Sequence, residues 1–340
     1  MSKKVKLFLV CLILSLFFWW GVNILEKGLE DFFYTRELEK QPSILQAQIS
    51  SVAFSKNQPV RKEEVPDLNI SAKSAISVFV DSQGKESVLF QKNESEKLPI
   101  ASLTKLMTAL VALDIYELSD KVKISKEAIE QEGEEVGLKV GEILSVNELL
   151  HIMLIESSND AAYALATRAP ARGEDEPLGS APTRAPARGG ERMREEGFVD
   201  LMNLEAEHNV GLNPETTHFI NSTGLDPRDA SQETNYSTAR DLAKLAKYLL
   251  QYKPEILKIL SQKENGTFHY HLENTNELLG EIEGIIGGKT GYTKRAGGCL
   301  LLILKGPRKD TFLINVILGS KDRFEEMKQL INWTKEAFKF

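Results

Sequence analysis

Cysteine and histidine are both scarce in this chain. Among its 340 residues there are two cysteines, and one of them, Cys11, lies in an apolar N-terminal run. The other, Cys299, lies in a predicted buried strand, so we expect no internal disulfide. Three of the five histidines are isolated or fall in an apolar stretch, and the pair His269 and His271 has no third ligand nearby. We therefore expect neither histidine catalysis nor a metal site.

Basic residues are also fewer than acidic residues. The chain has 42 lysines and arginines against 49 aspartates and glutamates, which gives a formal net charge of -7. A protein that binds nucleic acid through its overall field needs the opposite balance, so we expect no nucleic-acid partner. The apolar fraction of 42% is high enough for one large core, or for two lobes that share a site.

A long apolar segment occupies residues 7–25, and three lysines precede it within residues 1–6. At 1.5 Å per residue, a helix of this length crosses most of a hydrocarbon core about 30 Å thick. The basic residues before it and the acidic residues after it predict a cytoplasmic tail at residues 1–6, with the remainder outside. The segment lacks the Ala-x-Ala-like site of a cleaved signal peptide, so we expect a single-pass transmembrane anchor. Residues 26–68, which show no sustained period, would then form a juxtamembrane linker.

Strand patterns appear near both ends of residues 69–340, and helical patterns lie between them. This order predicts an α+β fold in which one antiparallel sheet draws strands from both chain ends and packs on a helical lobe. The active site would lie at their junction. The predicted strands are residues 75–80, 87–90, 298–304 and 312–318, and a terminal helix is predicted for residues 323–340.

Residues 167–196 stand apart in composition. The run Thr-Arg-Ala-Pro-Ala-Arg-Gly at residues 167–173 recurs at residues 183–189. Two copies cannot build a repeat fold, and the proline, glycine and arginine content is typical of disorder, so we predict an inserted low-complexity loop. A cationic arm for anionic wall polymer or lipid is the alternative interpretation, but loops accept neutral insertions at little cost.

The first motif with chemical meaning is a serine three residues before a lysine. It occurs at residues 82–85, in a predicted glycine-containing turn, and again at residues 102–105. Ser102 opens an apolar helical stretch after Pro99, so Ser102 and Lys105 should share one face of the first turn. Burial would lower the pKa of Lys105, and a neutral amine could take the Ser102 proton. The alternative is a capping serine beside a solvated lysine.

Ser-x-Asn is the second motif, and it occurs three times. The match at residues 55–57 lies in the polar linker, and the match at Ser145 is explained as a capping box with Glu148. The third, Ser157-Ser158-Asn159, lies in a predicted loop between two helices. We expect Asp160 to cap the helix that follows.

The third motif, Lys289-Thr290-Gly291, occurs once. Gly287-Gly288 precedes it and Tyr292-Thr293 follows it. The glycines would let the backbone pass close to a ligand. A lysine beside a hydroxyl can hold a carboxylate through charge-assisted hydrogen bonds.

In this order the three motifs are similar to those of class A β-lactamases and penicillin-binding proteins. The chain most resembles the low-molecular-mass penicillin-binding proteins that act as D-alanyl-D-alanine carboxypeptidases, over roughly residues 69–340. Further matches support this resemblance at residues 99–101, 159–162, 221–226 and 236–243. It implies a β-lactamase/transpeptidase-like fold, a penicillin-recognising serine peptidase domain at residues 69–340, and the third motif on an edge strand facing Ser102.

The resemblance also implies a role for each site residue. Ser102 would be the nucleophile, Lys105 its base, and Ser157 the relay of a proton to the leaving amine. Asn159 would bind the substrate backbone, and Lys289 and Thr290 would bind its carboxylate. Room for the substrate would come from Gly291, and the backbone N–H groups of Ser102 and Tyr292 would form the oxyanion hole.

The implied function is removal of the terminal D-alanine from peptidoglycan stem peptides, outside the bacterial cytoplasmic membrane. We expect no metal or organic cofactor, and we expect β-lactam antibiotics to act as covalent inhibitors. A β-lactamase is less favoured, because the chain lacks the Glu-x-x-Leu-Asn run used in deacylation. Two alternatives stay open: a D,D-endopeptidase that cuts cross-links, and a non-catalytic peptidoglycan-binding anchor or sensor. We also expect the family's usual C-terminal β-domain and membrane-binding tail to be missing, and the N-terminal anchor to replace that tail.

Overall fold

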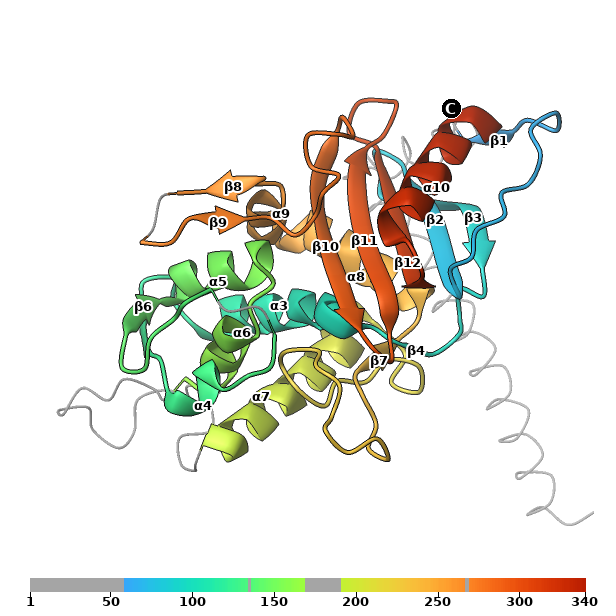
Figure 1. Cartoon of the computed structure of the whole chain (residues 1–340). Coiled ribbons are helices and arrows are strands. Elements are labelled where there is room, and N and C mark those ends of the chain that lie inside the picture. Colours follow the sequence, from blue (N-terminus) through green and yellow to red (C-terminus); the bar gives the residue numbers. More distant parts are fainter. Residues whose placement is uncertain (1–57, 134–135, 169–190, 267–268) are drawn as a thin grey trace, which may run out of the picture. The chain divides into compact units, whose positions relative to one another are not determined.

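The computed structural model describes residues 58–133, 136–168, 191–266 and 269–340 (Figure 1). The predicted tail at residues 1–6, the predicted anchor at residues 7–25 and most of the predicted linker lie outside these ranges. Within the described ranges, no helix combines the length and the hydrophobicity that a membrane crossing needs. Residues 59–340 form one folded unit.

The centre of this unit is a five-stranded antiparallel sheet in the order β10-β11-β12-β2-β3. It confirms the predicted sheet, since two strands come from the start of the unit and three from its end. All seven residues of β2 are buried, as expected for a strand covered on both faces. The strands are β2 (Ser74–Val80), β3 (Glu86–Lys92), β10 (Ile285–Thr293), β11 (Gly297–Lys305) and β12 (Phe312–Ser320).

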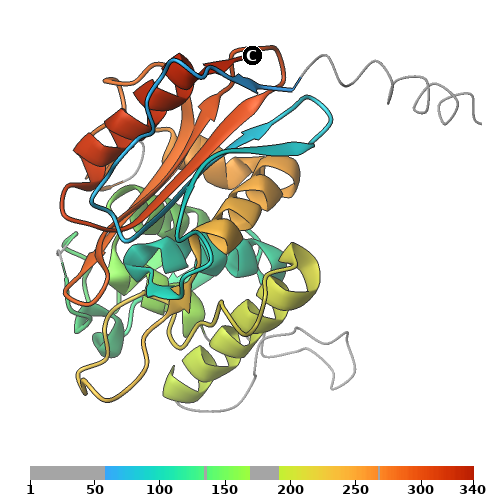
Figure 2. The same cartoon turned by 90° about the vertical axis from the view of Figure 1, so that its right-hand side faces the viewer.

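Helices cover both faces of the sheet, as Figure 2 shows for α10 (Arg323–Ala337) and α8 (Ala239–Tyr252). Side chains alternate between the two faces along β2. Ile76 and Val78 belong to the core shared with the helical lobe, whereas Ala75 and Phe79 pack in the core under α10. The fold is therefore three-layered around the sheet.

The helical lobe is built around α3 (Lys105–Ile115), whose first eight residues are all buried. A helix that is apolar all round belongs in a core, and α5 (Val146–Ile155), α6 (Asn159–Ala166) and α7 (Glu191–Glu205) surround it. The predicted capping box starts α5: Ser145 and Glu148 satisfy each other's backbone N–H groups.

The remaining described elements are short. The strands are β1 (Val60–Arg61), β4 (Leu98–Pro99), β5 (Lys121–Lys123), β6 (Ile143–Ser145), β7 (Tyr236–Ser237), β8 (Glu264–Asn265), β9 (Leu272–Glu273) and β13 (Phe338–Lys339). The helices are η2 (Ala101–Thr104), α4 (Lys126–Ile129), η3 (Ala206–Val210) and α9 (Pro254–Leu260).

Three boundaries differ from the sequence prediction. β1 pairs with β13, so residues 59–68 belong to the folded unit instead of a linker. The Arg61 guanidinium lies 4.9 Å from the ring centroid of Trp333, a long-range contact that a polar sequence does not reveal. Helix α7 begins at Glu191, so the end of the predicted 167–196 loop is helical. The terminal helix ends at Ala337, because the last residues pair with β1.

Candidate active site

Ser102 lies in the short helix η2, directly before α3. The residue before it, Ala101, has a left-handed backbone (φ 48°), which turns the chain from β4 into the helix. Lys105 starts α3, and its Nζ is 2.9 Å from the Oγ of Ser102. The structure thus brings the predicted nucleophile and base into hydrogen-bond contact.

The Lys105 amine is fully buried, with no exposed surface. Its two other hydrogen-bond partners are both acceptors, Oδ1 of Asn159 at 2.6 Å and the carbonyl of Thr223 at 2.7 Å. Burial, and then the nearby charge of Lys289, hold the pKa of Lys105 well below its ordinary value. A neutral amine beside a serine hydroxyl can act as a general base.

The conformation of the loop that carries the Thr223 carbonyl requires a glycine at position 224. This residue has a left-handed backbone (φ +83°), and a Cβ added to it would stand 2.1 Å from the carbonyl oxygen of Ala101. Gly211 has a similar φ of +73°, but an added Cβ there meets nothing within 4 Å. An added side chain would strain the backbone at both glycines, but it would overlap with neighbouring atoms only at Gly224.

We predict that Gly224→Ala lowers the free energy of unfolding by roughly 3 kcal/mol or more, since the left-handed backbone and the overpacking both cost energy. Gly211→Ala, the matched control, should cost only about 1 kcal/mol. Chemical denaturation of both variants measures the difference. Equal losses would contradict the close approach of Gly224 to η2.

Ser157 lies between α5 and α6 with a left-handed backbone (φ 62°), which is uncommon for a serine and is often kept at functional sites. Its Oγ accepts a hydrogen bond of 2.8 Å from Nζ of Lys289. Lys289 is 1% exposed, and burial together with the charge of Arg323 lowers its pKa to about 7. The second and third motifs therefore meet at this contact.

Asn159 is the first residue of α6. Its amide nitrogen donates to the carbonyl of Glu132 at 2.6 Å, which fixes the amide so that Oδ1 faces Lys105. The residue that caps α6 is Ser158, whose Oγ accepts from the backbone N–H of Ala161. The prediction of Asp160 as the cap was wrong; it lies in the first turn, where a carboxylate still suits the helix dipole.

The third motif lies on β10, the edge strand of the sheet, as predicted. A Cβ added at Gly291 would stand 3.0 Å from the backbone nitrogen of Ser102, so this glycine lets the strand approach the nucleophile. The hydroxyl of Thr290 pairs with that of Thr275 at 2.6 Å. The Tyr292 side chain is 66% exposed. The predicted oxyanion hole of the Ser102 and Tyr292 N–H groups stays a prediction.

Arg323 is a site residue that sequence reasoning missed. It is the first residue of α10, and its guanidinium donates to the carbonyl of Gly291 at 3.2 Å. Its charge is one reason for the low pKa of Lys289. A lone arginine that opens a terminal helix reads as a surface residue, and only the antiparallel pairing of β10, β11 and β12 brings it behind the third motif.

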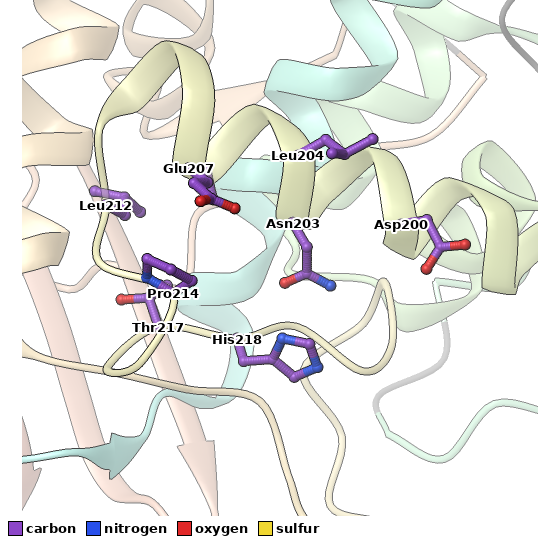
Figure 3. Close-up of a pocket in the computed structure, with 9 residues that line it drawn as sticks. Asp200, Asn203, Leu204, Glu207, Leu212, Pro214, Thr217 and His218 are labelled. Atoms are coloured by element: carbon purple, nitrogen blue, oxygen red, sulfur yellow. The ribbon is translucent and has the colours of Figure 1, made fainter.

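A cavity of about 490 Å³ lies elsewhere, between α7 and the segment that follows η3 (Figure 3). Asp200 and Asn203 line it from α7, and His218 lines it from the other side. No predicted site residue lines this cavity. Within the described ranges, no cluster of three histidine, cysteine or acidic side chains is arranged to hold a metal.

Comparison with known proteins points to one family. Residues 59–175 and 189–322 match the peptidase S11 family, described as D-alanyl-D-alanine carboxypeptidase. The carboxypeptidase DacF of Bacillus subtilis is 33% identical over 84% of this chain, and a D-alanyl-D-alanine endopeptidase of Pseudomonas aeruginosa is 30% identical over 76% of both chains. Penicillin-binding protein D2 of Listeria monocytogenes, solved with ampicillin bound, superposes with a TM-score of 0.61 at 29% identity, over 79% of this chain and 99% of that one.

The matched part is shorter than several of the relatives. The alignments span 66%, 57% and 60% of three curated carboxypeptidases. The family match nevertheless covers most of the folded unit, including all three motifs. The chain therefore belongs to the peptidase S11 family of D-alanyl-D-alanine carboxypeptidases.

Proposed function

We propose that this protein is a serine-type D-Ala-D-Ala carboxypeptidase that acts on peptidoglycan stem peptides. The observation that carries the proposal is the fully buried Lys105 amine, which lies 2.9 Å from the Ser102 hydroxyl and has a hydroxyl, an amide oxygen and a backbone carbonyl, but no carboxylate, as its hydrogen-bond partners within the described residues. A buried lysine that forms no ion pair with a carboxylate gains little stability from being charged. Family membership supports the same conclusion.

The reaction would begin when Ser102 Oγ attacks the carbonyl carbon of the penultimate D-alanine. Its proton moves to the lone pair of Lys105 as the C–O bond forms. The negative charge on the substrate oxygen would be held by the N–H groups of Ser102 and Tyr292. The C–N bond then breaks, and a proton reaches the leaving D-alanine nitrogen through Ser157. Water finally hydrolyses the ester and regenerates Ser102.

The substrate's terminal carboxylate would bind to Lys289 and Thr290. Burial and the charge of Arg323 lower the pKa of Lys289 to about 7 in the free protein. An incoming carboxylate favours the charged ammonium and would raise this pKa. The protein would thus recognise the free C-terminus through a charge-assisted hydrogen bond from Lys289, which suits an enzyme that removes a single terminal residue.

β-Lactam antibiotics are proposed as covalent inhibitors. The Listeria relative has been solved in ampicillin-bound and cefotaxime-bound forms. In our chain the lactam carbonyl would take the place of the penultimate D-alanine carbonyl. Ser102 would attack it, the ring C–N bond would open, and the ester would remain on Ser102.

Cleavage of cross-links is the second candidate function, because the Pseudomonas relative is an endopeptidase. Product analysis separates the candidates when the purified protein is given a D-Ala-D-Ala pentapeptide and, separately, a cross-linked muropeptide dimer. We expect release of free D-alanine from the pentapeptide to be faster than cleavage of the dimer. Preference for the dimer would favour the endopeptidase. Neither product, from a folded protein, would favour a peptidoglycan-binding anchor or sensor.

We also propose that residues 7–25 anchor the protein in the bacterial cytoplasmic membrane, with the catalytic unit outside. The support is the sequence alone: a long apolar segment preceded by lysines. Membrane fractionation tests it. The full chain should stay in the membrane after a high-salt wash and leave it only in detergent, whereas release by salt alone would refute the anchor.

A further inference from the structure

The number of hydrogen-bond partners on Lys105 limits how its amine can be oriented. A neutral amine has two N–H bonds and one lone pair. Two fixed acceptors besides Ser102, namely Asn159 Oδ1 and the Thr223 carbonyl, are at 2.6 and 2.7 Å. If they take both N–H bonds, the lone pair is left pointing at Ser102. The position of the Thr223 carbonyl therefore helps to set the direction of proton transfer.

The peptide that carries this carbonyl is held by Asn221, whose Oδ1 accepts from the Gly224 N–H at 2.7 Å, and the residue before Thr223, Ser222, is itself held on two sides. This residue has no exposed surface, and its carbonyl accepts a hydrogen bond of 2.7 Å from Thr108 Oγ1 on α3. Its backbone nitrogen and its Oγ both donate to Oε1 of Glu195, at 3.2 and 2.8 Å. Thr108 thus holds one side of the loop and Glu195 holds the other.

Glu195 comes from α7, the helix that packs against α3 in the helical lobe. It is not among the residues expected to touch substrate, and its Oε1 accepts hydrogen bonds from two atoms of Ser222. Burial raises the pKa of its carboxyl group, partly offset by the Ser222 hydrogen bonds. Such burial is costly, which makes a purely incidental carboxylate at this point unfavourable.

We propose that Glu195 is a positioning residue for the acylation step: it fixes Ser222, so that the Thr223 carbonyl directs the lone pair of Lys105 toward Ser102. This inference rests on the proposed function, because it requires Lys105 to accept the Ser102 proton. The positioning role needs Oε1 of Glu195 to accept the two hydrogen bonds from Ser222. It does not need the negative charge itself, because a carboxamide oxygen accepts the same two hydrogen bonds.

The test is the acylation rate of the full chain with a fluorescent penicillin, followed by stopped flow. Glu195→Ala should reduce the acylation rate constant roughly 10- to 100-fold, as expected when a group near the chemistry shifts by about 1 Å. Glu195→Asp keeps the charge but withdraws the acceptor by one methylene, and it should be slowed about 10-fold. Glu195→Gln should stay within about 3-fold of the wild type, since its oxygen still accepts.

Asp200→Ala is the matched control, since it removes a carboxylate from an exposed position on the same helix. It should acylate at the wild-type rate. The final labelled fraction reports how much protein is folded, whereas the rate constant reports only on the folded molecules. A role in folding alone would lower the labelled fraction and leave the rate constant unchanged.

The outcomes distinguish the positioning role of Glu195 from the proposed function itself. Slow Ala and Asp variants beside fast Gln and Asp200→Ala variants support the inference. Wild-type rate constants for Glu195→Ala or Glu195→Asp overturn it, as does a Gln variant as slow as the Ala variant. Should Glu195→Ala fail to fold, the Asp and Gln variants decide between these outcomes. Absence of any penicillin adduct on the wild type would instead refute the proposed function.

Discussion

Ser102→Ala is expected to eliminate the covalent penicillin adduct. The other groups of the site, Lys105 and Lys289, stay in place in this variant, but no oxygen remains to form the ester. Loss of an activated nucleophile typically costs a factor of at least about 10³ in rate. Mass spectrometry of the intact protein after benzylpenicillin treatment measures the result directly: the wild type gains the mass of the opened antibiotic, and the variant does not.

The chain supplies its own control for this experiment. Ser82 also lies three residues before a lysine, Lys85, but both side chains are exposed in the turn between β2 and β3. Ser82→Ala should form the adduct as fully as the wild type. An adduct on Ser102→Ala, or its loss from Ser82→Ala, would show that the nucleophile has been misassigned.

Lys105→Met is expected to slow acylation by roughly 10²- to 10⁴-fold, the usual contribution of a positioned general base. Methionine is apolar and similar in length, so it fills the same buried space without an amine. We expect the free energy of unfolding to change by less than roughly 3 kcal/mol, because loss of a buried polar group offsets the acceptors left unpaired on Asn159 and Thr223. Stopped-flow acylation and denaturant unfolding measure the two quantities.

The pH dependence of this reaction gives a second readout. In the wild type, acylation should rise with pH as Lys105 loses its proton, and it should level off well below the ordinary pKa of lysine, since burial and Lys289 lower the pKa of Lys105. Lys105→Met should lack this rise. The control, Lys85→Met, should keep both the rate and the profile. A wild-type rate that keeps rising up to the ordinary lysine pKa would argue against a neutral Lys105.

Much of the fold could be predicted from local patterns. The strands at both ends of the unit showed β-branched and apolar runs bounded by turns, and the structure pairs them into one antiparallel sheet. The capping box at Ser145 was also readable, because both partners lie within one helical turn. The boundary at residues 59–68 could not be read, since β1 depends on pairing with β13 at the far end of the chain.

The active-site residues also divide into those that local patterns predicted and those that only the tertiary structure revealed. The three motifs named Ser102, Lys105, Ser157 and Lys289, and the structure brings them together through the contacts of Lys105 with Ser102 and of Lys289 with Ser157. The Thr223 carbonyl was not readable, because a backbone oxygen carries no side-chain signature. Arg323 and Glu195 were missed for a related reason: a single charged residue on a helix gives no sign of being turned inward.

The amino-acid sequence by itself determined which reactive groups this protein has, in which order, and which elements carry them, because periodicity, caps and turn residues act over a few neighbours. Only the tertiary structure decided the charge state and direction of those groups. The pKa of Lys105 depends on its burial at the start of α3 and on the charge of Lys289, and the direction of its lone pair depends on acceptors more than fifty residues away in the chain. Such properties arise from packing between distant segments, and no local pattern records them.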